Sequence, residues 1–395
     1  MTDLPRITVL AGKHRRAKGG HPWIYANEVE MTPETKALPA GTLVSVYNSG
    51  GEPMGTAFCT PQTLAVARML DRRPNMAFTT DFVAERIARA AAWRRKLFTE
   101  PYLRLFHAEA DGLPGLIVDQ FGDGLVCQFN TAGLELHRET VLEGLRRVLD
   151  PSWIVLRNDS NQRGLERLPQ TIEPVLGAPP SPQPVIENGV TYLADIAGGQ
   201  KTGWFYDQRL NRAMMAELAP GARVLDAYCY LGGFGLLAAK AGASRVTLLD
   251  RSEPALALAM AAAEENNLVD RIAAEQSEVF AALEAYARSQ RVFDVVIIDP
   301  PAFAKSKKDL QPALRGYRKL ARLAANVVAP GGFLLANSCS HTVDLANFMV
   351  ETTRGIAEAG RNARILRTTG ASPDHPTHPQ LPESAYLKAL LLNLD

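Results

Sequence analysis

Alternation of short apolar segments with longer alanine-rich segments, over residues 220–395, constrains the fold more than any other feature of the chain. The apolar segments predict five strands, at 224–226, 246–250, 272–274, 295–299 and 332–337, and the intervening segments predict helices at 234–241 and 253–266. Strands that alternate with helices in this way form a doubly wound parallel sheet, so the fold class is α/β. Two late segments, 364–367 and 386–391, are expected to pair as a terminal hairpin.

The part of the chain before this sheet divides into two further regions. Residues 1–75 contain short strand-like segments separated by glycine and proline, which indicates a small β-barrel. Residues 76–183 mix a helix at 82–100, strands at 116–119 and 125–129, a helix at 134–149 and a strand at 153–157, and therefore predict an α+β domain. The segment 176–185 is rich in proline and glycine, as linkers are, so the last domain is expected to span 184–395.

Composition and cysteine spacing indicate the cellular compartment in which the chain is expected to function. Apolar residues make up 46% and charged residues 22%, which is ordinary for a globular protein in water, and no apolar run approaches the ~20 residues of a membrane span. The four cysteines are widely spaced and form no CxxC pair, which favours reduced thiols over disulfides or a zinc site. The first residues also lack the layout of a secretion signal. We therefore expect a cytoplasmic protein without a membrane or metal partner.

The loop after the first predicted strand has the features of a cofactor site. It runs from Asp226 to Gly235 and contains Gly232 and Gly233, which allow close approach of the backbone to a ligand. Asp250 ends the next strand, where a carboxylate can accept hydrogen bonds from ribose hydroxyls. A nicotinamide cofactor fits poorly, because its fingerprint needs G-x-G-x-x-G in the turn and Asp226 would repel a pyrophosphate. The ammonium of S-adenosylmethionine would not be repelled, so this cofactor is expected.

Two further strand ends carry candidate catalytic groups. The fourth strand ends in Asp299-Pro300-Pro301-Ala302-Phe303, and the fifth is followed by Cys339. In an open α/β sheet both positions face the ligand cleft. A thiolate that adds to C6 of a pyrimidine makes C5 nucleophilic enough to accept a methyl group, which is covalent catalysis. The alternative interpretation of Cys339 is a buried cysteine of the hydrophobic core, without a catalytic role. Cys229, in the cofactor loop, is expected to serve packing only.

The net charge of +1 predicts that any nucleic-acid contact is local. Between Pro5 and Asn27 every charged residue other than the histidines is basic, and these residues are Arg6, Lys13, Arg15, Arg16 and Lys18. They indicate either an RNA-binding surface or simply a solvated basic loop.

With these motifs the chain resembles bacterial 23S rRNA cytosine-5 methyltransferases that carry an N-terminal PUA domain. The resemblance covers essentially the whole length and rests on the segments 20–25, 109–119 and 200–209, together with Asp-Pro-Pro-Ala-Phe at 299–303 and Ser-Cys-Ser at 338–340. It implies a PUA domain, a central α+β domain and a Rossmann-like catalytic domain, 23S rRNA as the partner, and a dimer.

The resemblance also implies roles for individual residues. Cys339 would be the nucleophile, and Asp299 would hydrogen-bond the target cytosine near the cofactor. The remaining cofactor contacts would come from Asp226, Tyr228, Gly232, Asp250, Arg251, Glu278 and Gln208, and RNA contacts from Lys13, Arg15, Arg16, Lys18, Trp23 and Phe303. Glu278 stands where the family more often has aspartate, and Pro301 stands where many relatives have a second cysteine for product release.

Two alternatives stay open on the sequence. An Asp-Pro-Pro-aromatic motif also suits methylation of an exocyclic amine on adenine or guanine, for which no cysteine is needed. The second alternative is an RNA-binding ribosome assembly factor whose methyltransferase fold has lost its activity.

Overall fold

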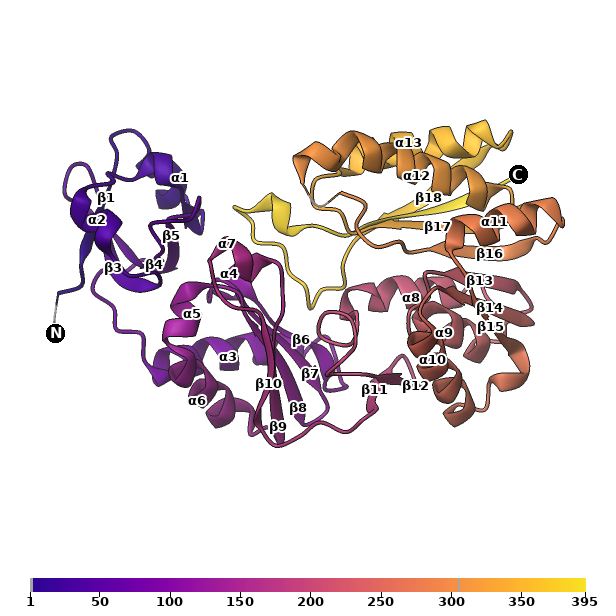
Figure 1. The fold of residues 1–395 in the computed structure, drawn as a ribbon, viewed down its shortest axis with the longest axis horizontal. Helices are drawn as coiled ribbons and strands as arrows, with labels where there is room; N and C mark the ends of the chain where they lie inside the picture. The colour runs from indigo at the N-terminus through magenta and orange to yellow at the C-terminus, as the bar shows by residue number, and fades with distance from the viewer. Residues whose placement is uncertain (1–2, 305) are drawn as a thin grey trace. The chain divides into compact units, whose positions relative to one another are not determined.

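The chain forms two units, each with its own sheets (Figure 1). A computed structural model describes residues 3–304 and 306–395. The first unit comprises residues 1–181, 195–204 and 374–382, and the second comprises 182–194, 205–373 and 383–395. None of the helices in the described ranges has the length and hydropathy needed to span a membrane.

The N-terminal part of the first unit is a five-stranded sheet. Its strands lie in the order β1-β3-β4-β5-β2 and comprise β1 (Arg6–Val9), β2 (Trp23–Ile24), β3 (Thr42–Asn48), β4 (Pro53–Cys59) and β5 (Ala67–Asp71), with the short helices α1 (His14–Lys18) and α2 (Pro33–Ala37) beside them. Alternate apolar residues such as Val44 and Val46 are completely buried in a core of their own. The small β domain expected from the sequence is therefore present.

The rest of the first unit is a second five-stranded sheet covered by helices. Its strands, in the order β10-β9-β8-β7-β6, comprise β6 (Tyr102–His107), β7 (Leu116–Phe121), β8 (Gly124–Phe129), β9 (Trp153–Asn158) and β10 (Thr171–Leu176). The helices are α3 (Thr80–Arg94), α4 (Ala108–Asp111), α5 (Ala132–Leu136), α6 (Arg138–Leu149) and α7 (Gln162–Leu165). The predicted helix at 82–100 is too long, and the one at 134–149 is divided at His137. The edge strands β6 and β10 were not predicted.

A seven-stranded sheet organises the second unit. Its order is β15-β14-β13-β16-β17-β19-β18, with β13 (Arg223–Ala227), β14 (Arg245–Asp250), β15 (Ile272–Gln276), β16 (Phe293–Ile298), β17 (Val328–Ser338), β18 (Ala363–Thr369) and β19 (Lys388–Leu394). The first five are parallel, as predicted, so their carboxyl ends share one edge. In Figure 1 helices lie on both sides of this sheet. They are α8 (Arg209–Ala216), α9 (Gly233–Lys240), α10 (Glu253–Glu265), α11 (Val279–Arg288), α12 (Leu310–Ala325) and α13 (Leu345–Glu358), and a hairpin of β11 (Gln183–Glu187) and β12 (Val190–Ala194) precedes them.

The terminal strands are more than the expected hairpin. β18 and β19 do pair antiparallel, but β19 also pairs antiparallel with β17 and so lies inside the sheet. In that register Ser338, at the end of β17, is opposite Lys388, at the start of β19. The antiparallel return of β19 therefore brings its first residue, Lys388, beside the residue that precedes Cys339.

Residues 374–382 leave the second unit and belong to the first, although the sequence places them in the C-terminal domain. Asp374 is completely buried there. Its carboxylate accepts a 3.0 Å hydrogen bond from the backbone N–H of Arg104, and its backbone carbonyl accepts one of 2.9 Å from Arg94. Buried hydrogen bonds thus hold this segment, which is interrupted by Pro376, Pro379 and Pro382.

Candidate cofactor and catalytic site

The loop after β13 begins at Asp226, which is completely buried. Its Oδ2 accepts a 2.8 Å hydrogen bond from the backbone N–H of Gly235 in the first turn of α9, where a helix leaves N–H groups unpaired. Its Oδ1 is buried and has no hydrogen-bond partner in the described structure. Burial, followed by smaller effects that include Asp299, raises the pKa of this carboxyl group to about 7. An unpartnered carboxylate oxygen here fits an incoming ammonium group.

Close packing explains the glycines of this loop. Gly232 has φ +72°, a left-handed conformation that glycine adopts without cost. A Cβ on Gly235 would lie 2.2 Å from Leu248 Cδ2 and 3.3 Å from Asp226 Oδ2. Tyr228 and Tyr230 also have positive φ, at 62° and 50°, which costs a non-glycine residue roughly 1 kcal/mol or more. The backbone is therefore held tightly against the sheet edge.

Asp250 ends β14 and organises the neighbouring rim. Its Oδ2 accepts a 2.9 Å hydrogen bond from Tyr230 N–H, and its Oδ1 accepts one of the same length from Ser252 N–H. Beside it, Arg251 and Glu278 approach to 3.9 Å and are both well exposed. Burial, and then the charges of Glu278 and Asp250, raise the pKa of Tyr228. The predicted cofactor residues thus gather at the ends of β13, β14 and β15, and this set of acceptors fits an adenosyl group.

Asp299 follows β16 and is held from α8. Its Oδ2 accepts a 3.0 Å hydrogen bond from Nε2 of Gln208, which is almost completely buried. The Oε1 of Gln208 in turn accepts a 2.6 Å hydrogen bond from Asn211. Gln208, expected from the resemblance to contact the cofactor, therefore contacts the predicted catalytic carboxylate.

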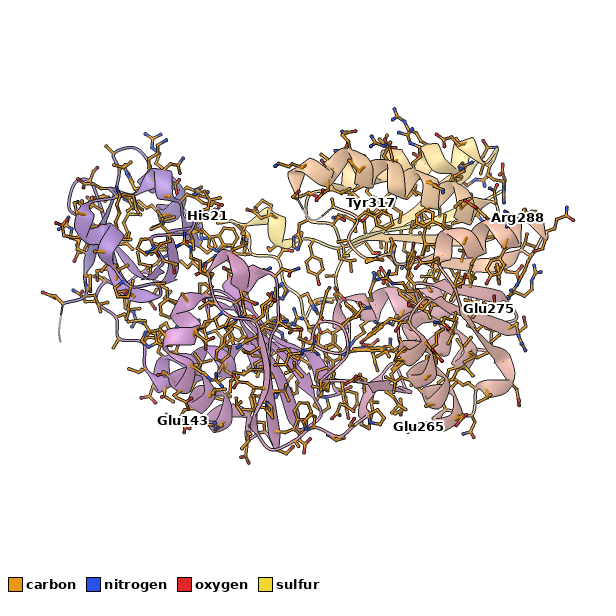
Figure 2. All side chains as sticks on the ribbon, in the orientation of Figure 1. His21, Glu143, Glu265, Glu275, Arg288 and Tyr317 are labelled. Carbon is orange, nitrogen blue, oxygen red and sulfur yellow. The ribbon has the colours of Figure 1, made fainter. Side chains whose placement is uncertain are left out.

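Cys339 lies directly after β17 and is partly exposed. Its Sγ is 3.9 Å from the backbone carbonyl oxygen of Pro300, the residue after Asp299. The flanking hydroxyls of Ser338 and Ser340 each lie 2.9 Å from the hydroxyl of Tyr317 on α12, which Figure 2 labels. The fold thus brings the two predicted catalytic segments together and does not bury the thiol in the hydrophobic core.

The other three cysteines differ from Cys339 because all are buried. Burial raises the pKa of Cys59 to about 12 and raises those of Cys127 and Cys229 strongly. Since the thiolate is the nucleophile, these thiols are poorly suited to attack. Cys229 packs in the cofactor loop as expected.

The predicted RNA-binding residues have different surroundings. Lys13, Arg15 and Lys18 are exposed at α1. Arg16 instead forms a 2.6 Å ion pair with Glu28 and lies over the ring of Tyr25.

Trp23 and Phe303 both make contacts within the protein. The indole N–H of Trp23 donates a 2.8 Å hydrogen bond to Glu109, and the guanidinium of Arg68 lies over its ring. The ring of Phe303 packs 4.7 Å from that of Tyr317. Their predicted contacts with RNA remain predictions.

Lys388 is a further candidate residue that was not predicted from the sequence. The sequence does mark it as unusual, since it is the single charged residue within the apolar run 387–394. The other seven residues of this run carry no charge, and most are leucine or alanine. In the structure Lys388 is buried beside the cysteine loop, where its Nζ donates to the backbone carbonyls of Ser340 and Tyr386.

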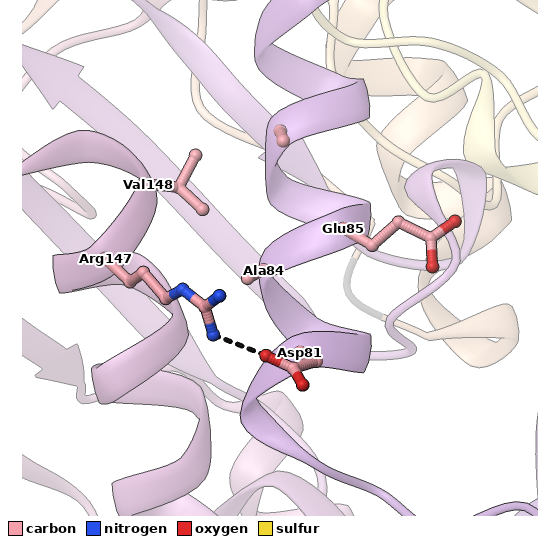
Figure 3. A pocket seen from close by; sticks show the side chains of 6 residues that line it. Asp81, Ala84, Glu85, Arg147 and Val148 are labelled. Atoms are coloured by element: carbon pink, nitrogen blue, oxygen red, sulfur yellow. Dashed lines mark hydrogen bonds and ion pairs between the residues drawn. The ribbon is translucent and has the colours of Figure 1, made fainter.

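A hollow of about 450 Å³ on the first unit holds none of these residues (Figure 3). It lies between α3 and α6, and two of its lining residues, Arg147 and Asp81, form an ion pair. Within residues 3–304 and 306–395 no group of three or more histidine, cysteine or acidic side chains is arranged to hold a metal ion. In the segment 374–382, the ring of His375 is 3.0 Å from the carboxylate of Asp374.

Comparison with known protein families identifies both ends of the chain. Residues 140–393 match the family model described as S-adenosylmethionine-dependent methyltransferase, and residues 7–72 match a PUA-like domain. Proteins named ribosomal RNA large subunit methyltransferase I are similar over nearly the full length. The protein from Photobacterium profundum is 35% identical, with 97% of each chain covered, and that from Shewanella frigidimarina is 36% identical, with 98% covered.

Solved structures have the same fold. A methyltransferase crystallised with SAH matches with a TM-score of 0.85 at 21% identity, over 99% of this chain and 100% of that one. A SAM-dependent methyltransferase from Streptococcus mutans matches with a TM-score of 0.83, also at 21% identity and with the same coverage. At this identity the likeness establishes the fold alone.

Proposed function

The chain belongs to the ribosomal RNA large subunit methyltransferase I family, and from that premise we propose that it methylates carbon 5 of a cytosine in large-subunit ribosomal RNA through a covalent adduct with Cys339. The protein is an S-adenosylmethionine-dependent methyltransferase, as its sequence predicts. The choice of base and atom is the proposal.

The main support for cytosine C5 as the target is the 3.9 Å distance between the Sγ of Cys339 and the backbone carbonyl oxygen of Pro300. Pro300 directly follows Asp299, so the one thiol that is partly exposed among the described residues lies next to the Asp-Pro-Pro segment. Transfer to an exocyclic amine needs no thiol at this place, whereas transfer to C5 of a pyrimidine does. The juxtaposition therefore favours carbon methylation.

The residues divide the reaction as follows. Cys339 loses its proton to water, and the thiolate forms a bond to C6 of cytosine while the C5=C6 electron pair moves to C5. Asp299, oriented by Gln208, hydrogen-bonds the polar edge of the base as charge develops on the ring. Once C5 carries the methyl group, its proton leaves to water. The S–C6 bond then breaks, which restores the ring double bond and frees Cys339.

S-adenosylmethionine, when bound, supplies an electrophilic methyl group. Asp250 is placed to accept hydrogen bonds from ribose hydroxyls. The unpartnered Oδ1 of Asp226 is suited to the ammonium of the methionine moiety. Tyr228 and Glu278 lie at the same rim, and Glu278 would hold the adenine amino group, as the resemblance implies.

The ribosomal RNA substrate is inferred from the relatives, whose names state it. The exposed Lys13, Arg15 and Lys18 on the PUA-like domain support it, because phosphate contacts position RNA without reading its sequence. A base paired in RNA has to be flipped out of its helix to reach Cys339.

The variant Cys339→Ala tests the proposal. With unmodified large-subunit rRNA and labelled S-adenosylmethionine, we expect methyl transfer to be lost while SAH binding stays within a few-fold of wild type. Cys59→Ala, in the sheet of the first unit, is the matched control and should retain activity. Wild-type product should be 5-methylcytosine by nucleoside mass spectrometry.

Other results would assign another function. Transfer retained by Cys339→Ala, with methyl on an exocyclic nitrogen, would establish amine methylation. Wild-type protein that binds the RNA and SAH but transfers no methyl group would instead indicate an assembly factor.

A further inference from the structure

Lys388 is a buried cation at the start of β19, with only 7% of its surface exposed. Its Nζ donates hydrogen bonds of 2.6 Å to the backbone oxygen of Ser340 and 2.7 Å to that of Tyr386. Both acceptors are neutral. Removing an ammonium group from water costs several kcal/mol, so its retention at this position calls for a function.

The ammonium group is tied to the segment that carries Cys339. Ser340, whose carbonyl it binds, is the next residue, and Ser338, the preceding one, is the cross-strand partner of Lys388. Burial lowers the pKa of Lys388 to about 8, whereas the negative charge of a Cys339 thiolate raises it. Because Lys388 binds the carbonyl of the residue after Cys339 and pairs across the strands with the residue before it, the ammonium lies beside the segment that carries the thiol.

The groups around this pair come from several elements. Tyr317 on α12 bonds the hydroxyls of Ser338 and Ser340, and Asp344 caps the N-terminus of α13 and also raises the pKa of Lys388. The ring of His341 packs 5.3 Å from that of Tyr386. Asp299, across the Pro300 contact, is the remaining acid of the catalytic segment. Without a proton, the tyrosines and aspartates among these neighbours are anions and His341 is neutral. Lys388 is therefore the cation beside the Cys339 thiol.

We propose that the buried ammonium of Lys388, fixed by the carbonyls of Ser340 and Tyr386, is a positioning residue that holds the Cys339 loop and stabilises the thiolate for attack. The inference rests on the proposed nucleophilic role of Cys339. A positive charge near sulfur favours the ionised thiol, as in known reactive cysteines.

The test measures ionisation of Cys339 directly, in the full-length protein without RNA. The rate of iodoacetamide labelling of the Cys339 peptide is followed by mass spectrometry from pH 6 to pH 10. The midpoint of this pH profile reports the pKa of the Cys339 thiol. For Lys388→Met and Lys388→Gln we expect this midpoint to rise, so that labelling at pH 7 falls about tenfold, because a nearby opposite charge shifts a pKa by one unit or more. Lys388→Arg keeps the charge and should keep the wild-type midpoint.

Lys319→Met, which removes an exposed lysine of α12 that pairs with Glu284, is the matched control and should leave the profile unchanged. A midpoint unaffected in Lys388→Met and Lys388→Gln would overturn the proposal, as would one that Lys388→Arg fails to restore. A role limited to holding the loop would change the labelling rate at all pH values without moving the midpoint, and would also overturn it.

If the uncharged variants do not fold, the midpoint of the labelling profile of the wild-type protein tests the proposal by itself. A value below the ~8.5 of free cysteine supports the inference, and a value at or above it contradicts it. Because no RNA is present, this result is independent of whether Cys339→Ala loses methyl transfer, so the two proposals fail separately.

Discussion

The side-chain amide of Gln208 donates a 3.0 Å hydrogen bond to the carboxylate of Asp299. The two residues are far apart in the sequence, and the contact crosses from the start of α8 to the end of β16. The side-chain oxygen of Gln208 accepts a hydrogen bond from the side-chain amide of Asn211, and the Oδ1 of Asn211 accepts one from the hydroxyl of Thr369. A chain of amides therefore sets the direction of the carboxylate that is proposed to meet the substrate base.

Gln208→Ala should lower kcat for methyl transfer about 10- to 100-fold, because losing a residue that orients a catalytic group typically has effects of this size. The KM for S-adenosylmethionine should change less than about threefold if the amide serves Asp299 rather than the cofactor. Steady-state kinetics on rRNA measure both values, with Gln162→Ala, an exposed site on the first unit, as control. A raised cofactor KM with unchanged kcat would assign Gln208 to cofactor binding.

The pKa of about 7 at Asp226 predicts that cofactor binding depends on pH. An ammonium group binds the carboxylate form, so below pH 7 binding has to displace a proton from Asp226. The Kd for SAH should therefore be roughly tenfold weaker at pH 6 than at pH 8. Asp226→Asn cannot ionise and should bind weakly, with little pH dependence, in isothermal titration calorimetry. A wild-type Kd that is constant over this range would show that Asp226 does not meet the ammonium.

Gly235→Ala should destabilise the second unit, because the added Cβ would lie 2.2 Å from Leu248 Cδ2 inside a packed interface. Overpacking of this kind costs about 1–3 kcal/mol in the free energy of unfolding. The control is Gly164→Ala, where nothing lies within 4 Å of the added atom, and it should shift stability by less than about 0.5 kcal/mol. Differential scanning calorimetry of both variants checks the difference. Equal melting temperatures for the two would contradict the packing seen here.

Replacement of Lys13, Arg15 and Lys18 by alanine should weaken rRNA binding without changing SAH binding. Each lost phosphate contact should reduce the magnitude of the slope of log K against log salt by about 0.7–0.9, hence by about 2–3 for the triple variant. A matched control removes the exposed Lys36, Arg95 and Lys96, which carry the same total charge elsewhere on the first unit. If both triple variants lose the same affinity, the effect is one of net charge and not of a local surface.

Much of the fold was predictable from local sequence. The strands that end at Asp250 and near Asp299, the glycine loop after Asp226 and the change to short strands before residue 75 each depend on hydrophobic period and on turn residues a few positions apart. Helices α12 and α13 and the hairpin β11–β12 were not predicted. The grouping of segment 374–382 with the first unit has no local signal, because its anchor is the distant pair Arg94 and Arg104.

The sequence by itself determined which chemical groups stand at strand ends, including Asp299 and Cys339, because in a parallel sheet the position of a residue along its own strand decides whether it reaches the ligand edge. Only the tertiary structure decided what meets there. The approach of Cys339 to Pro300, the hold of Gln208 on Asp299 and the burial of Lys388 all depend on which strands are neighbours and in what register. Pairing between distant segments is settled by the packing of the whole unit, so no local pattern reveals it.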